Sequence, residues 1–145
     1  MISFTTIGVS IKINNKRLLY NWINEIVSRE TKKICEVSYV FCSDEVLLKY
    51  NEQYLHHGDY TDIITFDYSE GDRIGGDIMI SSERVKENAK KYNVSFEEEM
   101  SRVMAHGILH LCGYKDKKKE ETKLMRGLEN KYMELFPKQA KPFFR

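Results

Sequence analysis

The segment between Ser95 and Gly113 constrains the fold most, because the sequence marks both of its ends as those of one helix. Ser95 and Glu98 form a capping box, in which each side chain accepts a hydrogen bond from the other residue's backbone N–H. Gly113 suits the left-handed conformation with which many helices end. Between them, apolar side chains recur at helical spacing: Met100, Val103, Met104, Ile108 and Leu111. We therefore expect one strong helix over this range.

Short strands alternate with longer helices along the rest of the chain. We expect strands over about 3–7, 36–41, 61–68 and 74–80, the last two as a hairpin-like pair. We expect helices over about 17–31, 43–55, 83–92 and 118–136, with Pro137 ending the last. No internal repeat or linker interrupts this pattern, so residues 1–145 are expected to form a single domain.

The composition is that of a globular chain. Of its 145 residues, 41% are apolar, 31% are charged and only 2 are proline, which excludes disordered, collagen-like and low-complexity proteins. No apolar stretch approaches the roughly 20 residues that span a bilayer, and the N-terminus lacks the pattern of a secretion signal. The 3 cysteines include no Cys-x-x-Cys pair, which argues against a disulfide framework or a cysteine zinc site. We expect a cytoplasmic protein with no membrane partner.

The net charge of +1 hides an uneven distribution. Residues 1–114 carry 13 basic and 17 acidic side chains, whereas residues 115–145 carry 10 basic and 5 acidic ones. A basic C-terminal part indicates a polyanionic partner for that part of the chain.

Two histidines mark a candidate metal site inside the helix. His106 and His110 are four residues apart, so both imidazoles project from one face at a spacing that suits one metal ion. A turn at Gly113 can bring Asp116 to the same point, which gives an open site of two histidines and one carboxylate with a position left for water. The alternative is a pair of histidines that bind no metal. Gly107 removes bulk beside the first histidine and allows close approach of another element.

Gly107 also decides against a peptidase. The helix is similar to the His-Glu-x-x-His signature of zinc peptidases, in which the glutamate is the general base, but the second position here is Gly107. A zinc peptidase is therefore the least favoured function.

Four segments together form a recognisable set of motifs. They are His106-Gly107-Ile108-Leu109-His110-Leu111-Cys112-Gly113-Tyr114, Asn51-Glu52-Gln53-Tyr54, Asp59 with Thr61-Asp62-Ile63-Ile64-Thr65-Phe66, and Gly76-Asp77-Ile78-Met79-Ile80-Ser81. Over about residues 35–130, their order and spacing resemble those of the YbeY family. The resemblance implies an α+β fold, with a small mixed β-sheet packed against about five helices, similar to zinc metalloproteases. It also implies a single-strand-specific metallo-endoribonuclease of the cytoplasm that acts in 16S rRNA 3′ end maturation and in ribosome biogenesis and quality control. Its partners would be rRNA and the small ribosomal subunit, and no DNA.

The chain departs from the family pattern at positions that matter for function. Asp116 stands where the family has its third histidine ligand, and Lys115 precedes it where an aspartate is usual. Leu55 occupies the position of a family arginine thought to bind or activate the RNA; His56, His57 or Lys49 are candidates to replace it. Asp67 stands in place of a common proline. These changes bear on efficiency and substrate choice more than on metal binding.

The expected mechanism is hydrolysis by metal-bound water, with His106, His110 and Asp116 as ligands of one Zn²⁺; Ni²⁺, Fe²⁺ and Mn²⁺ also suit this ligand set. Candidates for the general base are His56, His57 and Asp59, and Asp62 and Asp77 are candidates to orient the ligand histidines. Lys115, Lys117 and Lys118 are expected to attract RNA phosphates, and Tyr114, Phe143 or Phe144 to stack on bases. The main rival is a non-catalytic rRNA-binding assembly factor with a structural metal.

Overall fold

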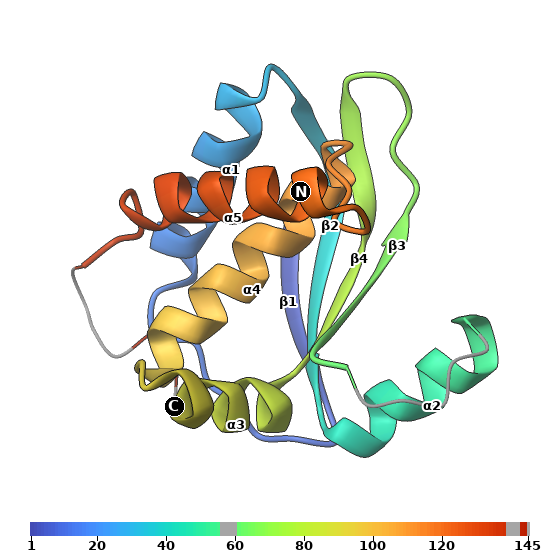
Figure 1. The fold of residues 1–145 in the computed structure, drawn as a ribbon, viewed down its shortest axis with the longest axis vertical. Coiled ribbons are helices and arrows are strands. Elements are labelled where there is room, and N and C mark those ends of the chain that lie inside the picture. Colours follow the sequence, from blue (N-terminus) through green and yellow to red (C-terminus); the bar gives the residue numbers. More distant parts are fainter. Residues whose placement is uncertain (56–60, 139–142, 145) are drawn as a thin grey trace.

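A computed structural model describes residues 1–55, 61–138 and 143–144. Along the chain the elements are β1 (Ile2–Ile7), α1 (Lys16–Arg29), β2 (Lys33–Cys42), α2 (Asp44–Leu55), β3 (Ile63–Asp67), β4 (Arg73–Ser81), α3 (Ser82–Tyr92), α4 (Phe96–Leu111) and α5 (Lys119–Met133). Four strands form one sheet, with most of the helices on one side of it and α2 on the other (Figure 1). The expected α+β class, with a mixed sheet and five helices, is confirmed.

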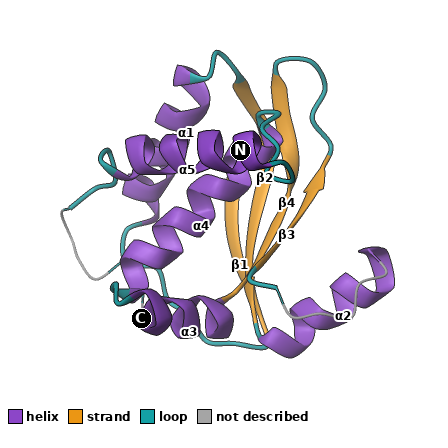
Figure 2. Ribbon diagram, viewed as in Figure 1, coloured by secondary structure: helices purple, strands orange, loops and turns teal. Residues whose placement is uncertain are grey.

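The sheet has the strand order β1-β2-β4-β3. β1 pairs with β2 and β2 with β4 in parallel, whereas β3 and β4 are antiparallel and form the expected hairpin. Parallel neighbours need crossover connections, and α1 provides the one between β1 and β2. β3, the strand that reaches the candidate site, therefore lies at an edge of the sheet (Figure 2).

Alternation along the strands divides the apolar residues between two faces. Val37, Tyr39 and Phe41 of β2 point into the main core, where they meet α1, α4 and α5. On the other face, a smaller cluster of Cys42, Leu47, Ile64 and Met79 lies under α2. α4, the helix that carries His106 and His110, is therefore on the side of the larger core.

α4 lies close against the sheet because glycines stand at the contact: Gly107 of α4 faces Ile78 of β4, and Gly76 of β4 faces Leu111 of α4. A Cβ atom on Gly107 would lie 2.7 Å from Cγ2 of Ile78, and one on Gly76 would lie 2.9 Å from Cδ2 of Leu111. The buried Tyr39 hydroxyl donates to the carbonyl of Met104 at 3.0 Å, which ties the middle of the helix to β2. The close approach that Gly107 predicts is confirmed.

Both predicted ends of this helix are found. The Ser95 hydroxyl accepts from the N–H of Glu98 at 3.1 Å, as expected for its N-cap. At the other end, Gly113 has φ of 109°, a left-handed conformation that favours glycine. α5 is shorter than expected, since it ends at Met133 rather than near residue 136.

The C-terminal aromatic residues correct one expectation. Phe143 and Phe144, expected to offer exposed rings to RNA, are 0% and 7% exposed. The Phe143 carbonyl accepts from the N–H of Asn14 at 2.9 Å, and Phe144 forms an antiparallel bridge with Ile13. These rings complete the core beside α1, so base stacking on them is excluded. Among the described residues, no helix has the length and apolar character needed to cross a membrane.

Candidate metal centre

α4 presents His106 and His110 on one face, one turn apart. Their ring centroids are 4.6 Å apart and the rings are nearly perpendicular, at 85°. The two side chains are 20% and 24% exposed, so they line an accessible surface rather than the core. The helical spacing therefore produces the common face that the sequence predicts.

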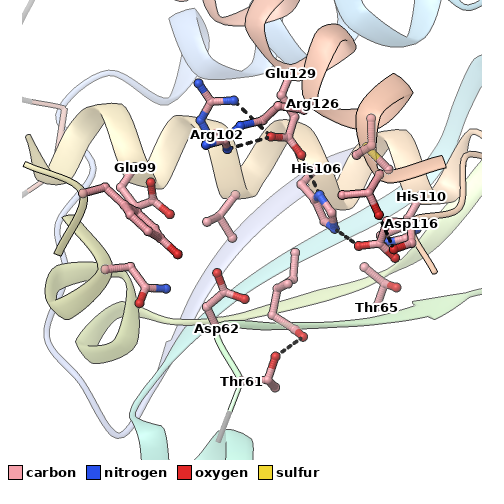
Figure 3. Close-up of a pocket in the computed structure, with 16 residues that line it drawn as sticks. Thr61, Asp62, Thr65, Glu99, Arg102, His106, His110, Asp116, Arg126 and Glu129 are labelled. Carbon is pink, nitrogen blue, oxygen red and sulfur yellow. Dashed lines mark hydrogen bonds and ion pairs between the residues drawn. The ribbon is translucent and has the colours of Figure 1, made fainter. Parts of the chain in front are cut away.

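Asp116 reaches both histidines from the segment after α4. Because the chain turns at Gly113, Asp116 Oδ2 lies 3.1 Å from His106 Nε2, and Oδ1 lies 3.5 Å from His110 Nε2 (Figure 3). The Thr122 hydroxyl donates to the Asp116 carbonyl at 2.9 Å and so ties this segment to α5. One ligand atom from each of the three residues lies within 4.8 Å of the others, so the group could hold a metal ion.

The second nitrogen of each imidazole is occupied by a different acceptor. His106 Nδ1 donates to Oε2 of Glu129 at 2.6 Å, and His110 Nδ1 donates to the Tyr114 carbonyl at 2.8 Å. With the protons on Nδ1, both Nε2 atoms offer a lone pair toward Asp116. Metal-bound imidazoles commonly have this arrangement, so these residues fit a metal such as Zn²⁺.

Glu129 is the carboxylate that orients His106. It is 4% exposed, and its Oε1 accepts from Arg102 at 3.1 Å and lies 3.6 Å from a guanidinium nitrogen of Arg126. Burial alone would raise the pKa of Glu129, but the hydrogen bonds from His106 and Arg102 outweigh it and leave the pKa below its ordinary value. Glu129 is therefore held as an anion.

The same partners act on the histidine. Burial lowers the pKa of His106, yet the hydrogen bond and charge of Glu129, together with the charges of Asp116 and Asp62, leave this pKa above its ordinary value. The same carboxylates therefore favour any positive charge at His106 Nε2, either a proton or a metal ion, and only one of the two can be bound there at a time.

The three residues lie at one end of a cavity of about 650 Å³, here called the central groove. Its lining comes from the start of β3, from α3, α4 and α5, and from the segment before α5: Thr61, Asp62, Ile63, Thr65, Asn88, Tyr92, Glu99, Arg102, Val103, His106, His110, Asp116, Thr122, Met125, Arg126 and Glu129. Two further carboxylates lie in it, since Asp62 and Glu99 face the groove (Figure 3). Burial is the main cause that raises the pKa of each above its ordinary value.

The structure separates the two aspartates expected to orient the histidines. Asp62 lies in the central groove, and its charge acts on His106. Asp77 alternates along β4 with Gly76 and Ile78, which face α4, so its side chain is on the opposite face of the sheet. There it accepts a hydrogen bond from the Tyr68 hydroxyl at 3.3 Å. Asp77 is therefore not brought together with the histidines.

The expected RNA-binding residues lie outside the groove lining. Lys115, Lys117 and Lys118 are exposed on the segment that carries Asp116 and are not part of that lining. Leu55 ends α2 with 40% exposure and is also absent from it. Tyr114, whose ring is expected to stack on bases, donates its hydroxyl hydrogen to Glu30 at 2.5 Å. His56, His57 and Asp59 lie outside the described residues.

Sequence reasoning missed four charged residues of the central groove: Glu129, Glu99, Arg102 and Arg126. A usable signal existed for the first: along α5 the buried positions are Met125, Glu129 and Tyr132, at helical spacing. A glutamate at a core position of an amphipathic helix needs a charged or hydrogen-bonded partner. The sequence could have raised that question, although it does not identify His106 and Arg102 as the partners.

Comparisons with known proteins agree on one family. The model of the YbeY family, described as Endoribonuclease YbeY, matches residues 3–137. A Flavobacterium psychrophilum protein named Endoribonuclease YbeY is 48% identical over 136 residues, which cover 94% of this chain and 96% of that protein. A Bacteroides fragilis protein of the same name is 48% identical over 130 residues, covering 90% of this chain and 94% of that protein. A solution structure of a Thermotoga maritima protein matches with a TM-score of 0.65 and 32% identity, covering 92% of this chain and 87% of that one.

Proposed function

The chain belongs to the YbeY family, and from this premise we propose that it is a metal-dependent endoribonuclease that hydrolyses single-stranded RNA. The observation that carries the proposal is the convergence of His106, His110 and Asp116 with both Nδ1 atoms already engaged. Relatives that align over nearly their whole length bear the name endoribonuclease. We take residues 1–145 as a single metallohydrolase domain.

The proposed ligands are Nε2 of His106, Nε2 of His110 and a carboxylate oxygen of Asp116, with Zn²⁺ as the first candidate. Two nitrogens and one oxygen suit zinc in an open site, and Ni²⁺, Fe²⁺ and Mn²⁺ are alternatives. When bound, the ion supplies Lewis acidity, which acidifies a water molecule and stabilises negative charge on a phosphate.

The protein's own groups have separate tasks in this proposal. Glu129 and the Tyr114 carbonyl fix the tautomer and direction of the two imidazoles. Asp62, which lines the groove, acts on His106 through its charge. Exposed Lys115, Lys117 and Lys118 attract the RNA backbone to the groove from outside it.

The proposed biological role is rRNA processing, including 16S rRNA 3′ end maturation, in ribosome biogenesis and quality control. The support is the family and the basic charge of residues 115–145. The proposed partners are rRNA and the small ribosomal subunit, and the proposed location is the cytoplasm.

The test compares metal content and RNA cleavage in the same preparations. The parent protein is expected to contain about one metal ion per chain and to cut a single-stranded rRNA fragment but not its duplex. His106→Ala and His110→Ala should lose both properties, whereas Lys123→Gln, an exposed change on α5, should lose neither. Cleavage that survives in both histidine variants would contradict the proposed mechanism. A metal-loaded parent that binds rRNA without cutting it would instead indicate an assembly factor.

A further inference from the structure

The central groove carries more acidic than basic side chains, although in the proposed function it receives a phosphodiester. The charged groups that line it are the carboxylates of Asp62, Glu99, Asp116 and Glu129 and the guanidinium groups of Arg102 and Arg126. A divalent cation at the histidines would offset part of this negative charge. The phosphate of the substrate still needs a positive side chain within the groove, and the described lining offers two.

Arg102 is already committed to the protein. Its side chain is 19% exposed, and its two terminal nitrogens donate to Glu129 at 3.1 Å and to Asn130 Oδ1 at 2.8 Å. Both acceptors belong to α5, so Arg102 joins α4 to α5 and holds Glu129 in place. Arg102 therefore supports the histidine site by positioning Glu129 and is not available to bind a phosphate.

Arg126 differs in both exposure and engagement. Its side chain is 60% exposed, and its ion pair with Glu129 is long, at 3.6 Å. A guanidinium group has five N–H donors in a planar fork that suits phosphate oxygens. Among the described residues, Arg126 is thus the exposed cation of the groove lining.

The position of Arg126 along α5 places it one carboxylate away from His106. It lies one turn after Thr122, whose hydroxyl bonds the Asp116 carbonyl, and three residues before Glu129, which bonds His106. One helical turn is about 5.4 Å, a span that the Arg126 side chain can bridge. Figure 3 shows Arg126 and Arg102 on the side of the Glu129 carboxylate that faces away from His106.

We propose that Arg126 is the phosphate-binding residue of the central groove, where its guanidinium group holds a backbone phosphate of single-stranded RNA on the side of Glu129 that faces away from the histidine and aspartate cluster. The inference rests on the proposed function, which it makes more specific. Leu55, which ends α2, has an apolar side chain outside the groove lining. Because Arg102 is engaged by Glu129 and Asn130, the arginine contact to RNA comes from Arg126 of α5.

The test measures RNA affinity at several salt concentrations in the zinc-loaded full chain. The probe is a fluorescent single-stranded 2′-O-methyl oligoribonucleotide, whose phosphates carry the ordinary charge, and the readout is anisotropy. Arg126→Gln is expected to weaken binding about tenfold, because a charge-assisted hydrogen bond is lost. The slope of log affinity against log salt should become shallower by about 0.7, the value for one phosphate on a single strand. Arg126→Lys should keep the slope and recover part of the affinity.

Lys123→Gln is the matched control, because it removes one positive charge from an exposed position of the same helix outside the groove lining. It should change affinity less than about twofold, as an exposed charge without a contact does. Equal effects of Arg126→Gln and Lys123→Gln, or a parent that does not bind the probe, would overturn the proposal. A loss of bound zinc in Arg126→Gln would also overturn it, since Arg126 would then act through Glu129. The proposed function fails separately if the zinc-loaded parent does not cleave unmodified RNA.

Discussion

Replacing Glu129 by glutamine tests whether an outer carboxylate determines the metal affinity of this site. Glutamine keeps the size of the side chain and can still accept from His106 Nδ1, but it removes the negative charge. Glu129 now makes a 2.6 Å hydrogen bond to His106 and a 3.1 Å hydrogen bond to Arg102 in a nearly buried position. The substitution therefore changes the charge beside the metal ligand while leaving the ligand itself in place.

The expected loss follows from these two contacts. A hydrogen bond to a charged group contributes about 1.5–3 kcal/mol and a neutral one about half of that. The metal-binding free energy should therefore weaken by the difference between the two kinds of hydrogen bond at His106, about 0.8–1.5 kcal/mol, and the upper value corresponds to a roughly tenfold weaker metal affinity. That value lies at the lower end of the roughly 10–100-fold known for outer partners of metal ligands. Without metal, the unfolding free energy should fall by about 2 kcal/mol, because Arg102 loses its anionic partner.

The assay is a zinc titration against a chelator, followed by urea unfolding of the metal-free protein. Glu99→Gln is the matched control, because Glu99 is also nearly buried in the groove, at 6% exposure. Burial raises the pKa of Glu99, so its charge opposes folding at neutral pH and its neutralisation should not destabilise the protein. Metal affinity within twofold of the parent in Glu129→Gln, or an equal loss in Glu99→Gln, would refute the argument.

Acid provides a second check on the same residue. Because the pKa of Glu129 is lower in the folded protein than in the unfolded chain, its contribution to stability is present above the unfolded pKa. That contribution is lost as the pH falls through the lowered folded value. The stability difference between parent and Glu129→Gln should therefore shrink in acid. A difference that stays constant there would show that the carboxylate charge is not its cause.

Three further predictions concern the ligands and the packing around them. Asp116→Ala should weaken zinc binding more than about 100-fold, beyond the range for outer partners, whereas Asp116→His should retain binding; the same chelator titration decides. Gly107→Ala should destabilise the protein by about 1 kcal/mol, because the new Cβ would lie 2.7 Å from Ile78 and the cost of this overpacking exceeds the gain in helix propensity. Gly127→Ala, whose Cβ would have no atom within 4 Å, should stabilise the protein, and urea unfolding of both variants measures the two effects. Zinc affinity should fall with decreasing pH, by at least about tenfold per pH unit well below the raised pKa of His106, because protons compete with the metal for the ligand imidazoles. A series of titrations at several pH values would contradict this if the affinity stayed flat.

The parts of the site that the sequence predicts are those set by local geometry. The spacing of His106 and His110 fixes their common face, and Gly113 fixes the turn that returns Asp116 to them. Each of these relations spans at most ten residues, so helix periodicity and the conformational freedom of glycine are sufficient to infer them. The same holds for the Ser95 N-cap. The β3–β4 hairpin spans more residues, but it joins strands that are neighbours in sequence across a turn.

The parts that the sequence does not predict depend on contacts between distant segments. Glu129 meets His106 only because α5 packs across α4, and no local pattern encodes that crossing. Asp77 lies between Gly76 and Ile78, which face α4, but strand alternation directs its own side chain to the opposite face of the sheet, away from the histidines. Phe144 is buried because it pairs with Ile13 at the other end of the chain. In each case tertiary packing, rather than residue type, decides the role.

The third candidate ligand and the end of α2 have a common electrostatic consequence. With Asp116 rather than a neutral histidine as the third ligand, a divalent cation held by this set would carry one positive charge less toward the substrate. Leu55, which ends α2, likewise supplies no positive charge. Both features weaken attraction for a phosphate, and the carboxylates of Asp62 and Glu99 add to that effect where they are ionised. Arg126 opposes this effect, because it lines the groove within one turn of Thr122 and Glu129, which bond Asp116 and His106. The carboxylate ligand and the proposed phosphate contact of Arg126 therefore act in opposite directions on the same quantity, the attraction of the groove for RNA.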